Sequence, residues 1–205
     1  MKLYYSPNLN PRVAVAVARH LEVPLSFVRA SPRDPAREDA FRPLNPNTLV
    51  PVLEEDDGST LWEADAIALR LSLLAKSDFW RRDDAEVVMI KWVSWATHHF
   101  IRHADRAYFE RVVVPGFADW PPNEAAIAED MVQFRKFAGI LDETLKGRTW
   151  LVEDRLSYAD FRVATPLAFA EKAQLPIAEF PEIMRWHDQL LALDAWRAPF
   201  AGLEA

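Results

Sequence analysis

Hydrophobic residues recur with two different periods along this chain of 205 residues. In residues 1–76, short apolar runs of strand length alternate with segments in which apolar residues recur every three or four positions. The pattern predicts strands at 2–6 and 25–29, and a helix at 11–21 whose apolar face includes Val13 and Val17. The stretch at 31–42 is polar and rich in Pro and Arg, and we predict no helix or strand there.

A β-hairpin is predicted next, because apolar runs at 50–53 and 60–62 flank the sequence Asp56-Asp57-Gly58. Asp-Gly accepts the positive φ that a tight turn needs. Pro51 suits the start of a strand, where a missing N–H is tolerated. Helical spacing at 64–76 then begins with acidic residues, as helix N-termini do. The resulting order, β-α-β and then β-β-α, is the one that a thioredoxin-like sheet requires.

Strand patterns end near residue 83, and long amphipathic helical patterns replace them. Helices are expected at 84–113, 123–145, 158–170 and 181–193. Ser157 and Asp160 resemble a capping box at the start of the third of these helices. The sequence therefore predicts an α/β thioredoxin-like domain at 1–76, a short linker, and an all-α helical domain at 84–205.

Composition narrows the class of protein. Half of the residues are apolar, with 8 Trp and 12 Phe, so the chain can fill an aromatic core. A net charge of −7 without a basic cluster excludes nucleic acid as an expected partner. No segment has the pattern of a membrane span or a signal peptide, so we expect a cytoplasmic protein that binds no membrane. The absence of Cys excludes disulfides, thiolate metal sites and a nucleophilic thiol.

The hairpin and the helix after it resemble the glutathione-binding core of the soluble glutathione transferases. In that family a Val-Pro pair with a cis bond precedes the third strand, and a Glu-Ser pair opens the next helix. The matching residues here are Val50-Pro51 and Glu63-Ala64. The opening MKLYYSP is similar to the family's first strand and active-site turn, and SYADF at 157–161 to its helix-capping signature. The resemblance implies a homodimer of a bacterial-like member without a catalytic Cys.

The resemblance also implies that the turn after the first strand contacts the sulfur of glutathione. A hydrogen-bond donor there, with the dipoles of a helix N-terminus, lowers a thiol pKa. Asn8 and Asn10 occupy the positions where branches of the family carry Ser or Cys, and a carboxamide NH₂ can donate to a thiolate. Ser6 is a third candidate. The alternative for Asn10 is a purely structural role as the N-cap, with Pro11 as the first helical residue.

The remaining glutathione contacts are implied by the residues around the hairpin. Val50, beside Pro51, would pair with the peptide backbone of glutathione, and Glu63 would accept from its α-amino group. Ala64 stands where the family has a Ser that binds the γ-glutamyl carboxylate, and Leu49 where many relatives have a Lys near the glycyl carboxylate. Losing the Ser hydroxyl leaves backbone N–H contacts, at a cost of about 1 kcal/mol.

A second-substrate pocket is predicted in the helical domain, where Trp95, His99, Arg102 and Arg106 recur at helical spacing and suit an aromatic or anionic electrophile. The alternative is that they are core aromatics with a solvated basic edge. His99 and His103 have metal-like spacing, but no third ligand is evident, so no metal is expected.

The resemblance therefore implies a transferase in which glutathione, as co-substrate, attacks a small apolar electrophile through its thiolate. Two alternatives stay open at this stage. One is a noncatalytic ligand-binding or interaction protein with the same fold, which Ala64 and Leu49 favour. The other is a glutathione-dependent isomerase, peroxidase or dehalogenase, because the fold alone does not fix the reaction.

Overall fold

A computed structural model describes residues 1–32, 34 and 36–203, and these separate into two units. Unit 1 comprises Met1–Trp80 together with the residues from Leu193 onward, and unit 2 comprises Arg81–Ala192. The sequence grouped everything after residue 84 into one helical domain. In the structure the C-terminal residues from Leu193 instead belong with the sheet, for reasons given below.

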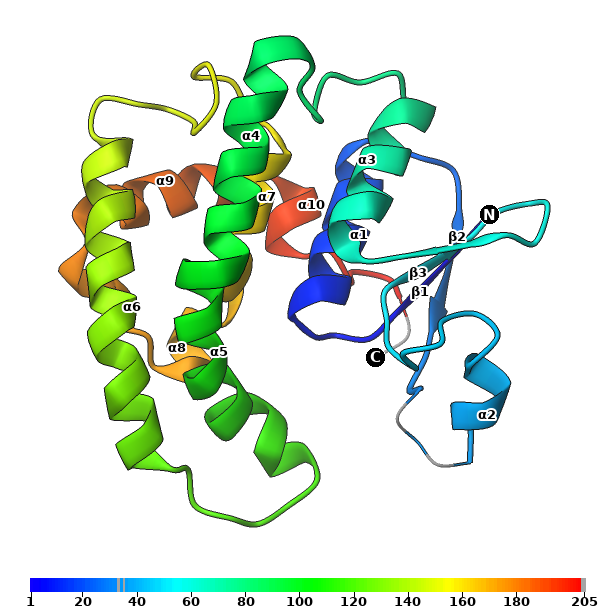
Figure 1. The fold of residues 1–205 in the computed structure, drawn as a ribbon, viewed down its shortest axis with the longest axis horizontal. Coiled ribbons are helices and arrows are strands. Elements are labelled where there is room, and N and C mark those ends of the chain that lie inside the picture. Colours follow the sequence, from blue (N-terminus) through cyan, green and yellow to red (C-terminus); the bar gives the residue numbers. More distant parts are fainter. Residues whose placement is uncertain (33, 35, 204–205) are drawn as a thin grey trace. The chain divides into compact units, whose positions relative to one another are not determined.

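The sheet of unit 1 has four strands in the order β2-β1-β3-β4 (Figure 1). They are β1 (Lys2–Tyr5), β2 (Ser26–Arg29), β3 (Val52–Glu54) and β4 (Thr60–Trp62). β1 and β2 are parallel, whereas β3 runs antiparallel to both β1 and β4. This is the predicted thioredoxin-like arrangement. The predicted start of the hairpin was too early, because β3 begins at Val52 and leaves Val50 and Pro51 outside the ladder.

The hairpin turn has the predicted chemistry. Gly58 has a φ of +84°, which the glycine adopts without a Cβ clash. The Ser59 backbone N–H donates to Asp57 Oδ1 at 2.9 Å, and the Glu55 N–H donates to the Ser59 carbonyl at 2.8 Å. A loop of this length with a left-handed Gly at its end is a common hairpin connection.

The helices of unit 1 cover both faces of the sheet. α1 (Leu9–His20) and α3 (Ala64–Leu74) pack together on the face that buries Leu3, and α2 (Glu38–Phe41) lies on the other face (Figure 1). The sequence missed α2, because its single turn lies in a polar stretch and has one buried anchor, Phe41. Phe41 packs edge-on against Tyr4, with ring centroids 5.8 Å apart.

The C-terminal segment joins unit 1 through α10 (Asp194–Arg197) and the residues after it. The Arg12 guanidinium of α1 stacks 4.5 Å above the Trp196 ring and donates to the Trp196 carbonyl. Burial lowers the pKa of Arg12 to about 10. Phe200 stacks on Tyr5 with ring centroids 5.5 Å apart, so the end of the chain completes the core beneath β1.

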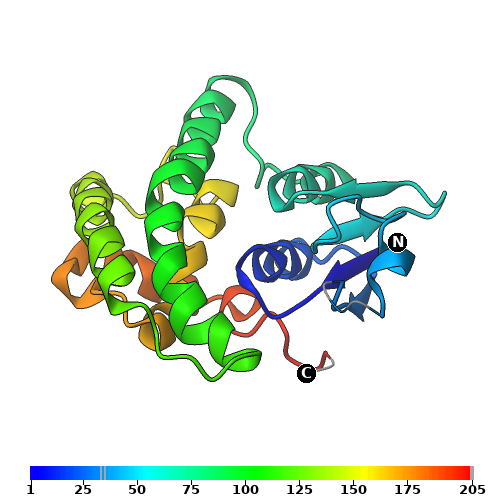
Figure 2. The same ribbon diagram turned by 60° about the horizontal axis from the view of Figure 1, so that its bottom comes forward.

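Unit 2 is built from helices, which Figure 2 shows from a second direction. A continuous helical run consists of α4 (Asp83–Trp95), the π-helical segment Ala96–Phe100, α5 (Ile101–Tyr108) and the π-helical segment Phe109–Val113. The other α-helices are α6 (Glu124–Leu145), α7 (Tyr158–Val163), α8 (Ala170–Ala173) and α9 (Pro181–Leu191). The single helix predicted at 158–170 is in fact interrupted by a 3₁₀ segment at Thr165–Phe169. No helix in the described ranges is long and apolar enough to cross a membrane.

The fully buried carboxylate of Asp160 holds unit 2 together at the start of α7. It accepts from the Ser157 N–H at 2.9 Å, which forms the predicted capping box, and from the Leu151 N–H at 3.0 Å. It also accepts from the Trp186 indole N–H of α9 at 3.1 Å. Burial raises the pKa of Asp160 to about 6, although these hydrogen bonds act in the opposite direction. One side chain thus ties a loop, a helix start and a distant helix together.

We expect Asp160→Ala to lower the free energy of unfolding by about 4 kcal/mol, because three buried N–H donors lose their acceptor. Asp154→Ala is the control for burial, since Asp154 is an exposed carboxylate that also accepts from two backbone N–H groups, those of Thr149 and of Trp150, the latter at 3.0 Å. Urea unfolding followed by circular dichroism measures both variants. Equal losses in the two variants would contradict the central role of Asp160.

Candidate functional site

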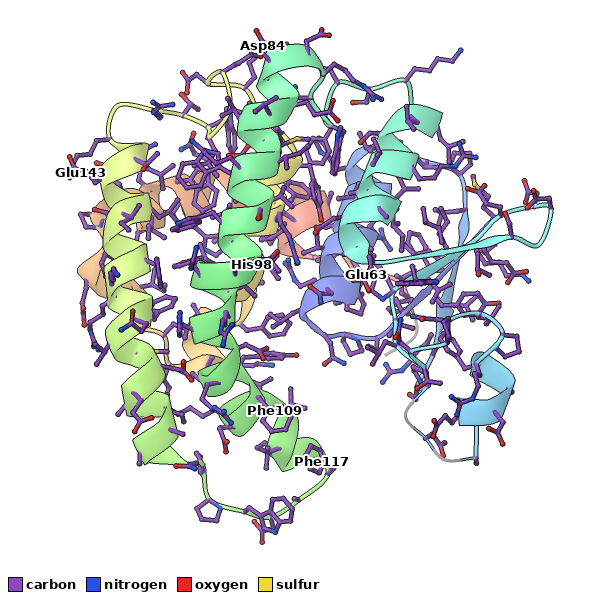
Figure 3. All side chains as sticks on the ribbon, viewed as in Figure 1. Glu63, Asp84, His98, Phe109, Phe117 and Glu143 are labelled. Carbon is purple, nitrogen blue, oxygen red and sulfur yellow. The ribbon has the colours of Figure 1, made fainter. Side chains whose placement is uncertain are left out.

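The register of the sheet brings three distant segments to one end of unit 1. Tyr4 pairs with Val52, and Val52 pairs with Trp62. The C-terminal ends of β1 and β4 and the start of β3 therefore lie at the same end of the sheet, where the chain continues into Ser6, into Glu63 and back to Pro51. We call the resulting group the strand-end site, made up of Ser6, Asn8, Val50, Pro51, Glu63 and Ala64. Figure 3 labels Glu63 where β4 passes into α3.

The β1–α1 turn differs from the sequence-based prediction. Asn8, not Asn10, is the N-cap, and its carbonyl accepts from the Arg12 N–H at 2.9 Å. The helix begins at Leu9, so Asn10 is the second helical residue and Pro11 the third. The structural role proposed for Asn10, as N-cap ahead of a first-position proline, was therefore wrong. Asn10 is exposed, and its part in sulfur binding stays a prediction.

Ser6 and Asn8 contact each other across a three-residue turn. The Asn8 N–H donates to the Ser6 carbonyl at 2.8 Å, with Pro7 in the middle of the turn. The Asn8 Nδ2 also donates to Ser6 Oγ at 3.0 Å. Ser6 is half-buried, whereas Asn8 is exposed. The turn therefore presents a hydroxyl and a carboxamide as one connected polar group.

The peptide bond between Val50 and Pro51 is cis, as the resemblance implied. Pro51 is buried and Val50 half-buried, while Leu49 is 40% exposed and carries no polar group. The loop ahead of them is held by Asn45, a buried residue that the sequence analysis missed. Asn45 Nδ2 donates to the Leu49 carbonyl at 2.8 Å, and Asn45 Oδ1 accepts from the Asn47 N–H at 3.0 Å. The signal for it was an Asn-Pro pair just before the Val-Pro pair.

The start of α3 forms the third part of the strand-end site. Glu63 is the N-cap, with φ 74° and ψ 124°, a conformation that costs about 1–3 kcal/mol in a residue with a side chain. Its exposed side chain makes no capping hydrogen bond. Ala64 is 4% exposed. The backbone N–H groups of a first helical turn have no acceptor within the helix, and the helix dipole adds positive potential, so this end suits a carboxylate.

Of the four residues predicted for a second substrate, Trp95 and His99 share a packing partner, whereas Arg102 and Arg106 have different surroundings. Trp95 and His99 pack on Phe137 of α6, with ring centroids 6.1 and 4.7 Å away respectively. Arg106 lies 3.7 Å from a carboxylate oxygen of Asp130, also on α6. Arg102 is exposed. Packing between helices explains three of these residues, and a substrate-binding role for any of them stays a prediction.

An exposed aromatic cluster lies elsewhere in unit 2, where the helical run ends. Phe109, Phe117 and Trp120 are 38%, 63% and 68% exposed. Phe117 lies 6.4 Å from Phe109 and 6.5 Å from Trp120 between ring centroids, and a shallow hollow follows the loop from Pro115 to Trp120. Figure 3 labels Phe109 and Phe117. The sequence analysis did not single out this cluster, because exposure of an aromatic residue cannot be read from a loop without periodicity.

Among the residues that the structure describes, no three His, Asp or Glu side chains lie close enough together to hold a metal ion. His103 Nδ1 instead lies 2.8 Å from Asp130 Oδ1, and the His103 ring stacks on Phe137 with centroids 5.6 Å apart. The metal-like spacing of His99 and His103 thus reflects a shared packing partner.

Two family models match the chain: "Glutathione S-transferase, N-terminal domain" over residues 12–72 and "Glutathione S-transferase, C-terminal domain" over residues 93–194. Glutathione S-transferase GstB of Escherichia coli K12 is 28% identical over 201 residues, covering 93% of this chain and 92% of that protein. Elongation factor 1-gamma of Carassius auratus is 29% identical over 189 residues, covering 89% of this chain and 41% of that protein.

Solved structures show the same fold at lower sequence identity. Glutathione transferase F7 from Populus trichocarpa superposes with a TM-score of 0.88 at 20% identity, covering 100% of this chain and 99% of that one. A glutathione S-transferase from Rhodospirillum rubrum F11 superposes with a TM-score of 0.87 at 20% identity, covering 100% and 93%.

We expect Asn45→Ala to lower the free energy of unfolding by about 2 kcal/mol, because the Leu49 carbonyl and the Asn47 N–H lose their partner. Asn47→Ala removes only the exposed Asn47 carboxamide, whose Nδ2 donates to Asn45 Oδ1 at 3.1 Å, and leaves both contacts of Asn45 with the backbone, so it should cost less than about 0.5 kcal/mol. Thermal and urea unfolding of both variants provide the comparison. A neutral Asn45→Ala would mean that the loop before Pro51 is held by other contacts.

Proposed function

Because the chain belongs to the glutathione S-transferase superfamily, we propose that it is a transferase in which the thiolate of glutathione attacks a small apolar electrophile. The observation that carries this proposal is the strand-end site. There the β1–α1 turn, the Val50–Pro51 segment and the start of α3 meet within one unit. A site of this kind offers polar side chains, strand backbone and a helix N-terminus to a single small peptide.

Each part of glutathione has a proposed partner in this site. The γ-glutamyl carboxylate binds the N-terminal turn of α3, where N–H groups and the helix dipole favour an anion. The α-amino group binds the Glu63 carboxylate, which is exposed and not used as a helix cap. The cysteinyl backbone pairs with Val50, which lies just outside the β3 ladder. The thiol then lies at the β1–α1 turn, near the polar side chains of Ser6, Asn8 and Asn10.

The proposed reaction needs a stabilised thiolate and correct positioning. The thiol proton leaves to solvent, the sulfur forms a bond to the electrophilic carbon, and the leaving group departs with the electron pair of the broken bond. The chain has no Cys, so the nucleophile belongs to glutathione and no thioether or disulfide to the protein forms. Catalysis comes from lowering the thiol pKa with hydrogen-bond donors and from holding the two reactants together.

We expect glutathione to bind more weakly here than in family members that carry a Ser at the position of Ala64 and a Lys at the position of Leu49. Ala64 offers no hydroxyl to the γ-glutamyl carboxylate, which costs about 1 kcal/mol. Leu49 offers no ammonium group to the glycyl carboxylate.

A role as a noncatalytic binding or interaction protein is the second candidate. It is favoured by the similarity to elongation factor 1-gamma, a protein of which this chain spans less than half. If the protein is an enzyme, the alternatives to a transferase are a glutathione-dependent isomerase, peroxidase or dehalogenase.

A homodimer is part of the proposal. The support is an apolar strip on α4, where Val87, Val88 and Ile90 are 69%, 40% and 48% exposed. Three large apolar side chains within four residues are unusual on a solvated helix face, and a second copy of the chain would cover them.

Calorimetry should detect glutathione binding to the unmodified protein, and Ala64→Ser should tighten it about fivefold by restoring a hydroxyl at the start of α3. Ala66→Ser is the matched control, because it adds the same group two residues further along the helix. It should leave the affinity unchanged. No binding at millimolar glutathione would reject the transferase proposal and favour the noncatalytic one. Binding that Ala64→Ser does not alter would place the γ-glutamyl group elsewhere.

Analytical ultracentrifugation should give twice the chain mass of 23.5 kDa for the unmodified protein. We expect Ile90→Glu to produce monomers, because a buried unpaired carboxylate is costly at an apolar interface. Ile140→Glu tests the specificity of this effect, since Ile140 on α6 is similarly exposed, at 44%. A monomeric unmodified protein, or a dimer that survives Ile90→Glu, would refute the proposed interface.

A further inference from the structure

The C-terminal segment, residues 193–203, is held on α1 by two arginine side chains. Arg12 and Arg19 lie seven residues apart, so they share one face of the helix. Arg12 stacks 4.5 Å above the Trp196 ring and donates to the Trp196 carbonyl. Arg19 donates to the Ala201 carbonyl at 2.6 Å. The segment is therefore fixed to α1 at two points along its length, and its helix α10 lies beside α1 (Figure 1).

The contact with Arg12 lies at the end of α1 where the β1–α1 turn enters the helix. Arg12 is the fourth residue of α1, and its N–H donates to the Asn8 carbonyl at 2.9 Å. Its side chain is only 7% exposed, and burial lowers its pKa with no carboxylate acting in the opposite direction. A guanidinium without an ion pair is costly to bury. The Trp196 ring and carbonyl are therefore the groups that hold this cation in place.

The same segment contacts the other end of the β1–α1 turn. Tyr5 is the last residue of β1, and the Phe200 ring stacks on it with centroids 5.5 Å apart and 17° between the ring planes. Tyr5 is buried and Phe200 is half-buried. Aromatic pairs of this kind contribute stability beyond the area that they bury. The C-terminal segment thus contacts the residue just before the turn and the first helical turn after it.

The turn itself, residues 6–8, buries little surface, because Pro7 and Asn8 are exposed. A short exposed turn opens easily unless its two ends are fixed. We infer that the C-terminal segment is a positioning element for glutathione, because it holds Tyr5 and Arg12 and thereby keeps the turn in the conformation that binds the ligand. This inference rests on the proposed function. It gives the segment no contact with glutathione itself.

Two consequences distinguish positioning from simple packing. If loss of the Phe200 ring reduces the binding-competent turn to about one fifth of the population, the apparent Kd for glutathione rises about fivefold. Coupling between two sites is also reciprocal, so glutathione should make the C-terminal segment less mobile. A segment that only fills the core would change stability without either effect.

The test compares Phe200→Ala with Val17→Ala in the full chain. Val17 is fully buried in the C-terminal half of α1, so both variants should lower the urea midpoint, but only Phe200→Ala releases an end of the turn. Calorimetry measures the Kd for glutathione, and hydrogen exchange follows the Asn8 N–H, which donates to the Ser6 carbonyl at 2.8 Å. Phe200→Ala should raise the Kd about fivefold and speed this exchange. Val17→Ala should alter neither, and Phe200→Tyr, which keeps the ring, should restore both.

The outcomes separate this inference from the proposed function. Failure of the unmodified protein to bind glutathione would reject both. Binding with the same Kd in Phe200→Ala would keep the transferase proposal and overturn the inference, and so would equal rises in Phe200→Ala and Val17→Ala. If Phe200→Ala does not fold, the unmodified protein decides through the Ala201 N–H, which donates to the Ala198 carbonyl at 3.0 Å. Saturating glutathione should slow its exchange, and an unchanged rate would overturn the inference.

Discussion

Strand β3 is the constraint on which the arrangement of unit 1 depends. It has only three residues, yet it pairs with β1 on one side and β4 on the other. Val52 is fully buried and lies opposite Tyr4 and Trp62 at once. A shift of one residue in this register would turn Val52 to the other face of the sheet. It would also separate Ser6, Val50 and Glu63, which lie beyond the paired residues. Hydrophobic burial on β3 therefore fixes the geometry of a polar site that it does not itself contain.

Much of this fold could be predicted from the sequence, because periodicity and turn chemistry act locally. The hairpin around Gly58 and the capping box of Ser157 and Asp160 both carry their signals within a few residues, and both are confirmed. Elements whose stability comes from distant partners were missed. The single turn of α2 depends on Phe41 reaching Tyr4, and the placement of the C-terminal segment depends on Arg12 meeting Trp196. Neither contact leaves a periodic pattern in its own segment.

The same holds for the candidate site: local motifs were predicted correctly, whereas contacts between side chains were not. Motif resemblance located the segments, but it could not show which side chain faces which. The sequence offered Asn10 as an alternative N-cap on the basis of Pro11, whereas the helix begins earlier and Asn8 takes that position. The interaction of Asn8 with Ser6 is a consequence of this shift. Asn45 was overlooked for a related reason, since the Asn-Pro pair signals a turn but does not show that the Asn side chain is buried or that it binds the Leu49 carbonyl.

The residues that stabilise the fold and the residues of the candidate site differ in burial. The groups that hold the structure, such as Val52, Asn45 and Asp160, are buried, whereas Asn8 and Glu63 of the candidate site are exposed. Substitutions at exposed positions usually change stability by less than about 0.5 kcal/mol, so the fold can persist while the site changes. The main exception is Glu63, whose strained backbone is held by the surrounding structure. This difference in burial is consistent with the similarity of one chain to both a glutathione S-transferase and an elongation factor 1-gamma, because a shared fold leaves the exposed side chains of a site free to differ.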